Sequence, residues 1–155
     1  MRSLKRVAIF VAITITLSVI LVLAGITITY LSLNNSSWQL DYLVLNNERQ
    51  TTYTHQTPSL HFEGLEIRGS GGCNDLFGRY IPLMFGRLTI SSLGRTAVGC
   101  RIVNEETGER IDVNYYEAQF LDALWKAHRV ELEAQTLRVY FGKGEADVIV
   151  FVRLP

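Results

Sequence analysis

The sequence has only two cysteines, Cys73 and Cys100, among its 155 residues. A structural zinc site takes about four ligands at short spacings, which two cysteines alone cannot supply. The histidines His55, His61 and His128 do not complete a site, because no two of them have the i, i+4 or H-x-H spacing of a metal pair. We therefore expect neither a metal site nor a cofactor.

Familiar catalytic and nucleotide-binding motifs are also missing. In the glycine-rich segment 69–80, Cys73 follows Gly72 where a P-loop needs a lysine, and Asn74 replaces the third glycine of a dinucleotide fingerprint. No G-x-S-x-G elbow is present, and no serine triad can be assembled. We expect no catalytic residue, and we interpret the glycines as steric devices that let the backbone turn and approach a neighbouring strand.

Charge is absent from residues 7–33, a long apolar run. A helix needs about 20 apolar residues to cross a bilayer, so this run is long enough to span one. Arg2, Lys5 and Arg6 precede the run, and such a positive flank is expected to stay in the cytoplasm while the rest of the chain is exported. We therefore predict a cytoplasmic segment at 1–6 and a transmembrane anchor at 7–33.

A cleaved signal peptide is the alternative interpretation of residues 7–33. The run is longer than the usual core of a signal peptide, and it shows no clear small-x-small cleavage site, so an uncleaved anchor is favoured. Leu23-Ala24-Gly25 begins like a bacterial lipoprotein-processing motif. Ile26 stands where that motif needs a cysteine, so no lipid can be attached there.

We interpret residues 34–37 as a short linker and residues 38–155 as the exported domain. Beyond the N-terminal cations the chain has 12 Lys and Arg against 15 Asp and Glu, a net charge near −3. An acidic domain without a basic cluster is a poor binder of nucleic acid. In an oxidising compartment the even cysteine count favours a disulfide between Cys73 and Cys100, with two separate buried thiols as the alternative.

Alternation of apolar and polar residues predicts short strands through most of this domain. One helix is predicted between the early and late strands, at residues 114–127, where Phe120 and Leu124 belong to an apolar stripe. Asn114 is expected to cap this helix and Glu117 to reach back to its first turn. Gly94 is expected to end the strand before it. The predicted strands lie at 38–45, 59–63, 65–68, 87–91, 130–134, 137–141 and 148–152.

This order of elements predicts an α+β fold. Its parts are a curved antiparallel sheet that forms a partial barrel, one packed helix, and the N-terminal transmembrane helix before them. The combination of motifs resembles the META domain family, which includes bacterial heat-shock lipoprotein-like envelope proteins. The resemblance covers about residues 37–153. It rests on Trp38, Gly72-Cys73-Asn74, Phe77-Gly78-Arg79-Tyr80, Thr96, Cys100, Glu117, Phe120, Leu124 and Leu137.

The resemblance implies a small domain in the bacterial envelope, linked in general terms to stress tolerance, drug resistance or virulence. It implies no settled biochemical activity. The chain departs from the family pattern at Ile26 and at residues 96–99, which read T-A-V-G where T-x-M-A is more usual. We expect Gly72, Cys73, Asn74, Gly78 and Tyr80 to form a structural motif, with Phe77 and Tyr80 packing it against the domain.

The leading hypothesis for function is a membrane-tethered, non-enzymatic domain that acts in envelope stress tolerance. Its expected partners are the membrane, through residues 7–33, and an envelope protein, a lipid or a peptide. A small apolar ligand inside the curved sheet is a weaker possibility. The alternative hypothesis is a thiol-dependent enzyme or redox sensor, which requires Cys73 to be exposed with a lowered pKa.

Overall fold

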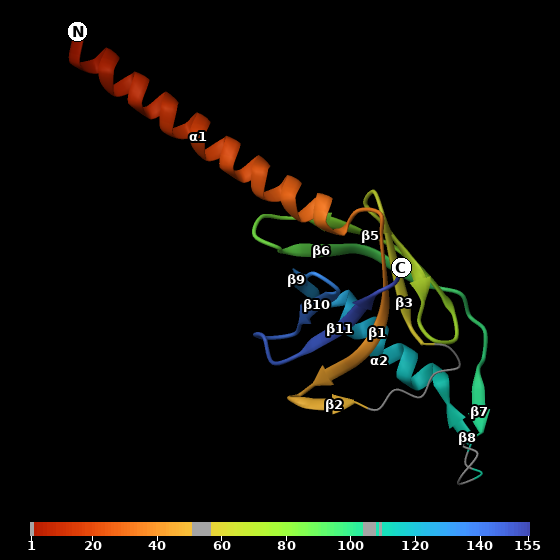
Figure 1. Ribbon diagram of the computed structural model, residues 1–155. Coiled ribbons are helices and arrows are strands. Elements are labelled where there is room, and N and C mark those ends of the chain that lie inside the picture. The colour runs from red at the N-terminus through yellow and green to blue at the C-terminus, as the bar shows by residue number, and fades with distance from the viewer. Residues whose placement is uncertain (1, 51–56, 104–107, 109) are drawn as a thin grey trace.

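A computed structural model shows a long N-terminal helix joined to a curled antiparallel sheet (Figure 1). The structure describes residues 2–50, 57–103, 108 and 110–155. Helix α1 runs over Arg2–Leu33, and strand β1 covers Ser36–Leu45. Only two residues therefore separate the helix from the sheet, and the domain lies directly at the end of α1.

The stretch Ile9–Leu33 of α1 is long and apolar enough to cross a membrane by its length and composition. Its hydroxyl side chains bond to the helix itself. Thr16 Oγ1 donates to the Ala12 carbonyl at 2.9 Å, and Ser18 Oγ donates to the Thr14 carbonyl at 2.9 Å. Polar groups satisfied in this way can be accommodated in an apolar environment.

Nine antiparallel strands form the main sheet. Its spatial order is β6-β5-β4-β3-β1-β11-β10-β9, with β2 paired to β1, while β7 and β8 form a separate hairpin. After β1 the bounds are β2 Glu48–Gln50, β3 Ser59–Glu63, β4 Glu66–Ser70, β5 Asp75–Pro82, β6 Leu88–Arg95, β7 Arg101–Val103, β8 Arg110–Asp112, β9 Ala127–Glu133, β10 Thr136–Phe141 and β11 Val148–Arg153.

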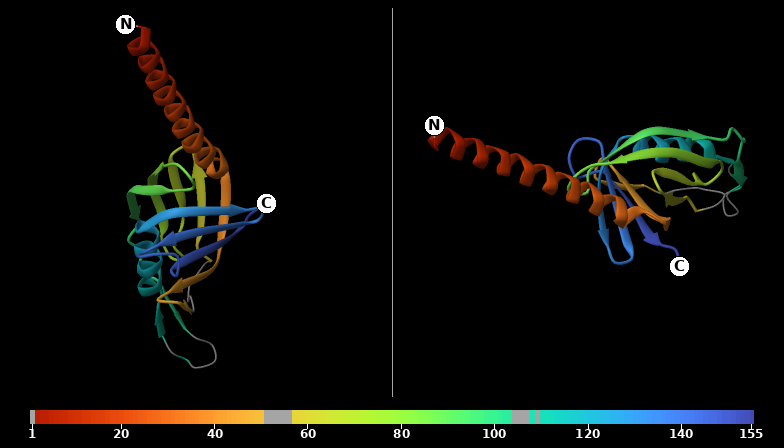
Figure 2. Two further views of the ribbon diagram at one scale, coloured as in Figure 1. Left: turned by 90° about the vertical axis from the view of Figure 1, so that its left-hand side faces the viewer. Right: turned by 90° about the horizontal axis from the view of Figure 1, so that it is seen from above.

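The sheet curls until its two end strands, β6 and β9, approach each other (Figure 2). Arg87, just before β6, forms a bridge with Arg129 of β9. The Val130 amide donates to the Gly86 carbonyl at 2.7 Å. Helix α2, Val113–Trp125, packs between β6 and β10. The result is an α+β half-barrel with one packed helix, as the sequence predicts.

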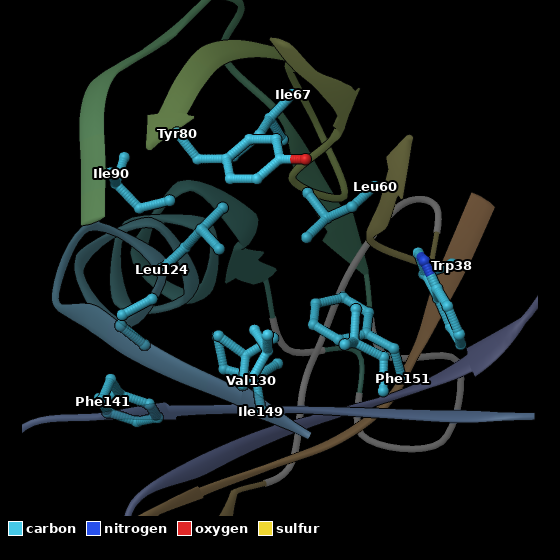
Figure 3. Packing of buried hydrophobic residues seen from close by; sticks show 14 of the residues in the cluster. Trp38, Leu60, Ile67, Tyr80, Ile90, Leu124, Val130, Phe141, Ile149 and Phe151 are labelled. Atoms are coloured by element: carbon cyan, nitrogen blue, oxygen red, sulfur yellow. The ribbon is translucent and has the colours of Figure 1, made fainter. Parts of the chain in front are cut away.

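Side chains fill the concave side of the half-barrel (Figure 3). The Tyr80 and Phe62 rings meet edge to face at 5.4 Å, and the Phe120 ring on α2 meets Phe151 at 6.2 Å. Trp38 is fully buried, and its indole Nε1 donates to Ser36 Oγ at 2.7 Å. The buried hydrophobic residues therefore join the sheet, α2 and the start of β1 in one core.

The predicted capping of the helix is wrong. Helix α2 begins at Val113, and its N-cap is Asp112, whose carboxylate accepts a hydrogen bond from the Asn114 amide at 3.0 Å. Asp112 lies where the chain leaves β8, so its side chain reaches the free amides of the first turn before Asn114 can. Glu117 does not return to that turn, because it is buried and bonded to Asn74 and Arg95.

Gly94 does not end its strand, contrary to prediction. Strand β6 continues to Arg95, and Gly94 pairs with Phe77 of β5. The Phe77 ring occupies the space that a side chain at position 94 would need, with Cε2 2.6 Å from an ideal Cβ. The predicted packing of Phe77 into the domain is also wrong, since it is 54% exposed, whereas Tyr80 is 1% exposed.

Candidate functional site

The glycine-rich turn, residues 69–74, leads from the end of β4 into β5. Its backbone closes on itself, because the Gly71 amide donates to the Asn74 carbonyl at 2.9 Å. Gly72 has a φ of 104°, a conformation that side chains disfavour. A Cβ on Gly69 would overlap the Ser59 carbonyl oxygen of the paired strand β3. Both glycines therefore have a steric reason to be glycine.

Below this turn lies the Glu117 cluster, in which buried Glu117 and Asn74 meet Arg95, whose side chain is 33% exposed. Glu117 is fully buried in α2 and Asn74 is 1% exposed. Glu117 Oε1 accepts from the Asn74 amide at 2.7 Å, and Oε2 accepts from Asn74 Nδ2 at 2.6 Å. Arg95 Nη1 donates to the same Oε2 and supplies the opposite charge. Oε1 thus has a neutral donor, and Oε2 has one neutral and one charged donor.

Gly71 is the residue that makes room for this carboxylate. A Cβ on Gly71 would lie 2.5 Å from Glu117 Oε1 and 2.6 Å from its Cγ. Any larger residue at position 71 would push the buried carboxylate away from Asn74.

The Asn74 side chain also holds the segment that follows β6. Its Oδ1 accepts from the Val98 amide at 2.6 Å and from Thr96 Oγ1 at 3.2 Å. Two residues further on, Cys100 is bonded to Cys73, with the Cα atoms 5.9 Å apart, as the disulfide interpretation requires. A crosslink across this sequence separation restricts the unfolded chain by about 3–4 kcal/mol in the entropy model.

These contacts decide what the arrangement can do chemically. The two oxygens of Glu117 accept from Asn74 and Arg95, the Asn74 side chain also bonds to the segment after β6, and Cys73 has no free thiol because it is bonded to Cys100. The site therefore acts as a clamp that joins the glycine-rich turn, α2, β6 and the segment before β7. Its chemistry as it stands is structural.

The remaining residues singled out by sequence lie apart from this cluster. His61 Nδ1 bonds to Ser37 Oγ at 2.8 Å, His128 lies in β9, and His55 falls outside the described residues. In the part of the chain that the structure describes, no three His, Cys, Asp or Glu side chains are grouped so as to hold a metal. His61 is thus bonded to Ser37, and Cys73 is bonded to Cys100.

Tyr80 of the predicted motif lies in the core, and its hydroxyl donates to the Gly64 carbonyl at 3.2 Å. Burial, with a smaller contribution from the nearby Tyr30, raises the pKa of Tyr80 to about 12. Gly78 lies in β5 opposite β6, where a Cβ would approach the Ser92 carbonyl oxygen to 2.5 Å.

The sequence interpretation missed Arg95 and misassigned Glu117. One signal was available, because Glu117 precedes Phe120, Leu121 and Leu124 by three, four and seven residues and so shares their apolar stripe. A charged residue in such a stripe is buried with the core and needs a buried partner. The identity of that partner depends on the fold.

A shallow groove lies on the outer surface beside the Glu117 cluster. It has a volume of about 270 Å³ and runs between β6 and α2. Trp125 is half exposed in this groove, and Arg95 connects its wall to buried Glu117. The lining residues are Leu93, Gly94, Arg95, Leu121, Asp122 and Trp125.

Comparisons with known proteins agree with this geometry. A family model described as META domain matches residues 31–154. No match was found among curated proteins. An NMR structure of a protein from Burkholderia xenovorans is similar, with a TM-score of 0.62 and 23% identity over 81% of this chain and 86% of that one. A crystal structure of a DUF4847 family protein from Bacteroides vulgatus has a TM-score of 0.51 and 14% identity, over 77% and 93%. At these identities the structures show a shared fold alone.

Proposed function

Since the chain belongs to the META domain family, we propose that it is a membrane-tethered, exported domain whose role is to bind a partner in the cell envelope. The apolar helix Ile9–Leu33, which leads directly into the domain, is the observation that carries this proposal. Arg2, Lys5 and Arg6 before the helix favour a cytoplasmic N-terminus and an exported domain.

Three features of the domain support binding as its role. Glu117 and Asn74 are buried and hydrogen-bonded within the domain, and Cys73 is held in a disulfide. The concave side of the sheet is filled by side chains, which argues against a small apolar ligand inside it and for a partner on the outside. The groove at Trp125 combines exposed aromatic surface with Arg95, and both residue types are enriched at protein interfaces.

Fractionation of cells that express the full chain tests the anchor. We expect the chain to stay in the membrane fraction after alkaline extraction and to keep its N-terminal segment in intact-mass measurement. Protease added outside spheroplasts should remove the domain. A shorter chain released from the membrane would contradict the anchor and establish a cleaved signal peptide.

Photocrosslinking tests the partner. A benzophenone amino acid in place of Trp125 should crosslink one defined envelope protein, and the same probe at exposed Tyr115, on the first turn of α2, should not. Loss of the chain should then lower tolerance to an envelope stress. An absent crosslink together with unchanged stress tolerance would contradict the proposed role.

The alternative thiol-dependent role requires the bridge between Cys73 and Cys100 to open. Alkylation followed by mass spectrometry under oxidising and reducing growth conditions distinguishes the two roles. An intact bridge in all conditions would exclude the thiol role, and a reversible Cys73 adduct would favour it over the binding role.

A further inference from the structure

The turn between β5 and β6, residues 83–87, presents apolar side chains on its outer side. Phe85 at its tip is 80% exposed and Leu83 is 38% exposed, while Ile81, two residues earlier on β5, is 50% exposed. Exposed apolar side chains gathered in this way indicate an interaction surface.

Hydrogen bonds from several directions hold this β5–β6 turn. The Leu83 amide donates to the Arg87 carbonyl at 2.7 Å and closes the turn. The Gly86 amide donates to Thr29 Oγ1 of α1 at 3.2 Å, and the Gly86 carbonyl accepts from the Val130 amide at 2.7 Å. The turn is thus attached both to β9 and to α1, so its position along the helix is set.

The stability of the fold does not explain why a phenylalanine occupies position 85. Its φ is 58°, in the left-handed region that favours glycine and disfavours a bulky side chain. Because the ring is mostly exposed, it contributes little core contact to offset that conformation. A strained and exposed aromatic residue indicates a function outside the folded domain.

The contacts with α1 place the turn at the edge of the apolar span. Met84 of the turn packs close to Gly25 of α1, since an ideal Cβ on Gly25 would lie 3.5 Å from Met84 Cβ. One helical turn further along α1, Thr29 bonds to Gly86. About 20 helical residues are needed to cross the hydrocarbon core of a bilayer. Counted from Ile9, where the apolar stretch begins, this length ends near Ile28. Figure 1 shows the turn beside the last third of α1, on the side from which the helix leaves the domain.

We infer that the β5–β6 turn is a second membrane contact, with Phe85 and Leu83 inserted at the outer boundary of the bilayer that α1 spans. The inference rests on the proposed function, in which α1 stays in the membrane. The turn would then hold the domain in one orientation on the bilayer, because α1 and the turn contact the same leaflet at two points.

The surface around the turn fits a lipid partner. Its apolar side chains continue the exposed apolar surface of α1, where Ile28 and Leu31 lie at the same depth. Aromatic rings are favourable at the boundary between acyl chains and head groups. Arg87 is exposed at the base of the turn and makes no ion pair within the described part of the chain, which leaves its guanidinium available to lipid phosphates.

Depth-dependent fluorescence quenching tests this contact in the full-length chain. Phe85→Cys is labelled with an environment-sensitive fluorophore, and the protein is reconstituted into phosphatidylcholine–phosphatidylglycerol vesicles that carry nitroxide lipids. Tyr115→Cys is the matched control, because Tyr115 is also an exposed aromatic residue but lies on α2, away from α1 (Figure 1). Flotation of the same vesicles reports whether the chain remains anchored.

We expect the probe at position 85 to shift to the blue and to lose most of its emission to nitroxide lipids, while the probe at position 115 does neither. If the chain floats with the vesicles but both probes behave alike, the turn does not touch the bilayer, although the anchor stands. If probe 85 is shielded from aqueous iodide without lipid quenching, a protein covers the turn, and the inference is overturned. If the chain does not float, the proposed function fails and the inference with it.

Discussion

At the scale of single residues, the buried carboxylate of Glu117 is the group on which the glycine-rich turn depends. Every donor that faces it comes from another segment, namely the Asn74 amide and side chain and the Arg95 guanidinium. Glu117→Gln should lower the free energy of unfolding by about 3–5 kcal/mol, because Arg95 loses its partner and an amide NH₂ must face other donors. Denaturant unfolding of the detergent-solubilised chain measures the change.

Glu133→Gln is the matched control for that substitution. Glu133 also pairs with an arginine, Arg138, but the Glu133 side chain is 65% exposed, whereas the Glu117 side chain is fully buried. This variant should change the free energy of unfolding by less than about 1 kcal/mol. Equal effects of the two substitutions would contradict a structural role for the Glu117 cluster.

The raised pKa of Tyr80 predicts that the domain loses stability at alkaline pH. This pKa is about 12 in the folded domain, chiefly because of burial, against about 10 in an unfolded chain. The folded state therefore favours the neutral phenol. The stabilisation that the neutral Tyr80 phenol provides is complete below pH 10. It is lost as the pH rises toward 12, because the unfolded state releases the phenolic proton first.

Tyr80→Phe isolates this effect, because it removes the ionisable group and keeps the ring. The variant should be less stable near neutral pH by about 1 kcal/mol, since the bond to the Gly64 carbonyl is lost. Between pH 10 and 12 the wild-type chain should lose this advantage in denaturant unfolding. Parallel pH curves for the two proteins would show that Tyr80 does not govern the alkaline loss.

At the scale of elements, strands could be predicted from the sequence wherever the pattern of apolar and polar residues has one structural interpretation. The alternation at 59–63 and 137–141 predicts strands that match β3 and β10, because strands with one buried face alternate. The continuous apolar run at 148–152 predicts a strand covered on both faces, which matches β11. The end of β6 was not predictable in this way. Gly94 weakens a strand by itself, but the Phe77 ring from β5 covers it, and that neighbour is known only from the pairing.

The Glu117 cluster could likewise be predicted only in part, because its contacts join segments that are distant in the sequence. The glycine-rich motif could be found because its residues are consecutive, and the cysteine pair because there are only two. The contact of Glu117 with Asn74 spans 43 positions of sequence and requires α2 to cross beneath the turn. Local propensity instead favoured a capping role for Glu117, which the buried ion pair with Arg95 overrides.

At the scale of the whole molecule, α1 and the domain form one packed unit. The described side chains of α1 are exposed at Val7 and over residues 9–24, after which Gly25, Thr29 and Leu33 face the domain. Thr29 bonds to Gly86, and Leu33 is fully buried in the core beside the sheet. Apolar composition alone could not separate these last turns from the rest of α1, because an apolar stretch suits a membrane span and a protein core equally.

This packing predicts that one substitution in α1 destabilises the domain. Leu33→Ala should lower the free energy of unfolding of the domain by about 2–5 kcal/mol, since it leaves a cavity in the core. Leu31→Ala is the matched control, because Leu31 is 63% exposed on the same helical turn and should have little effect. Domain unfolding, followed in micelles by the near-ultraviolet signal of Trp38, distinguishes the two variants. Equal stabilities would show that α1 adds nothing to the stability of the domain, and a selective loss in Leu33→Ala would show that α1 completes its core.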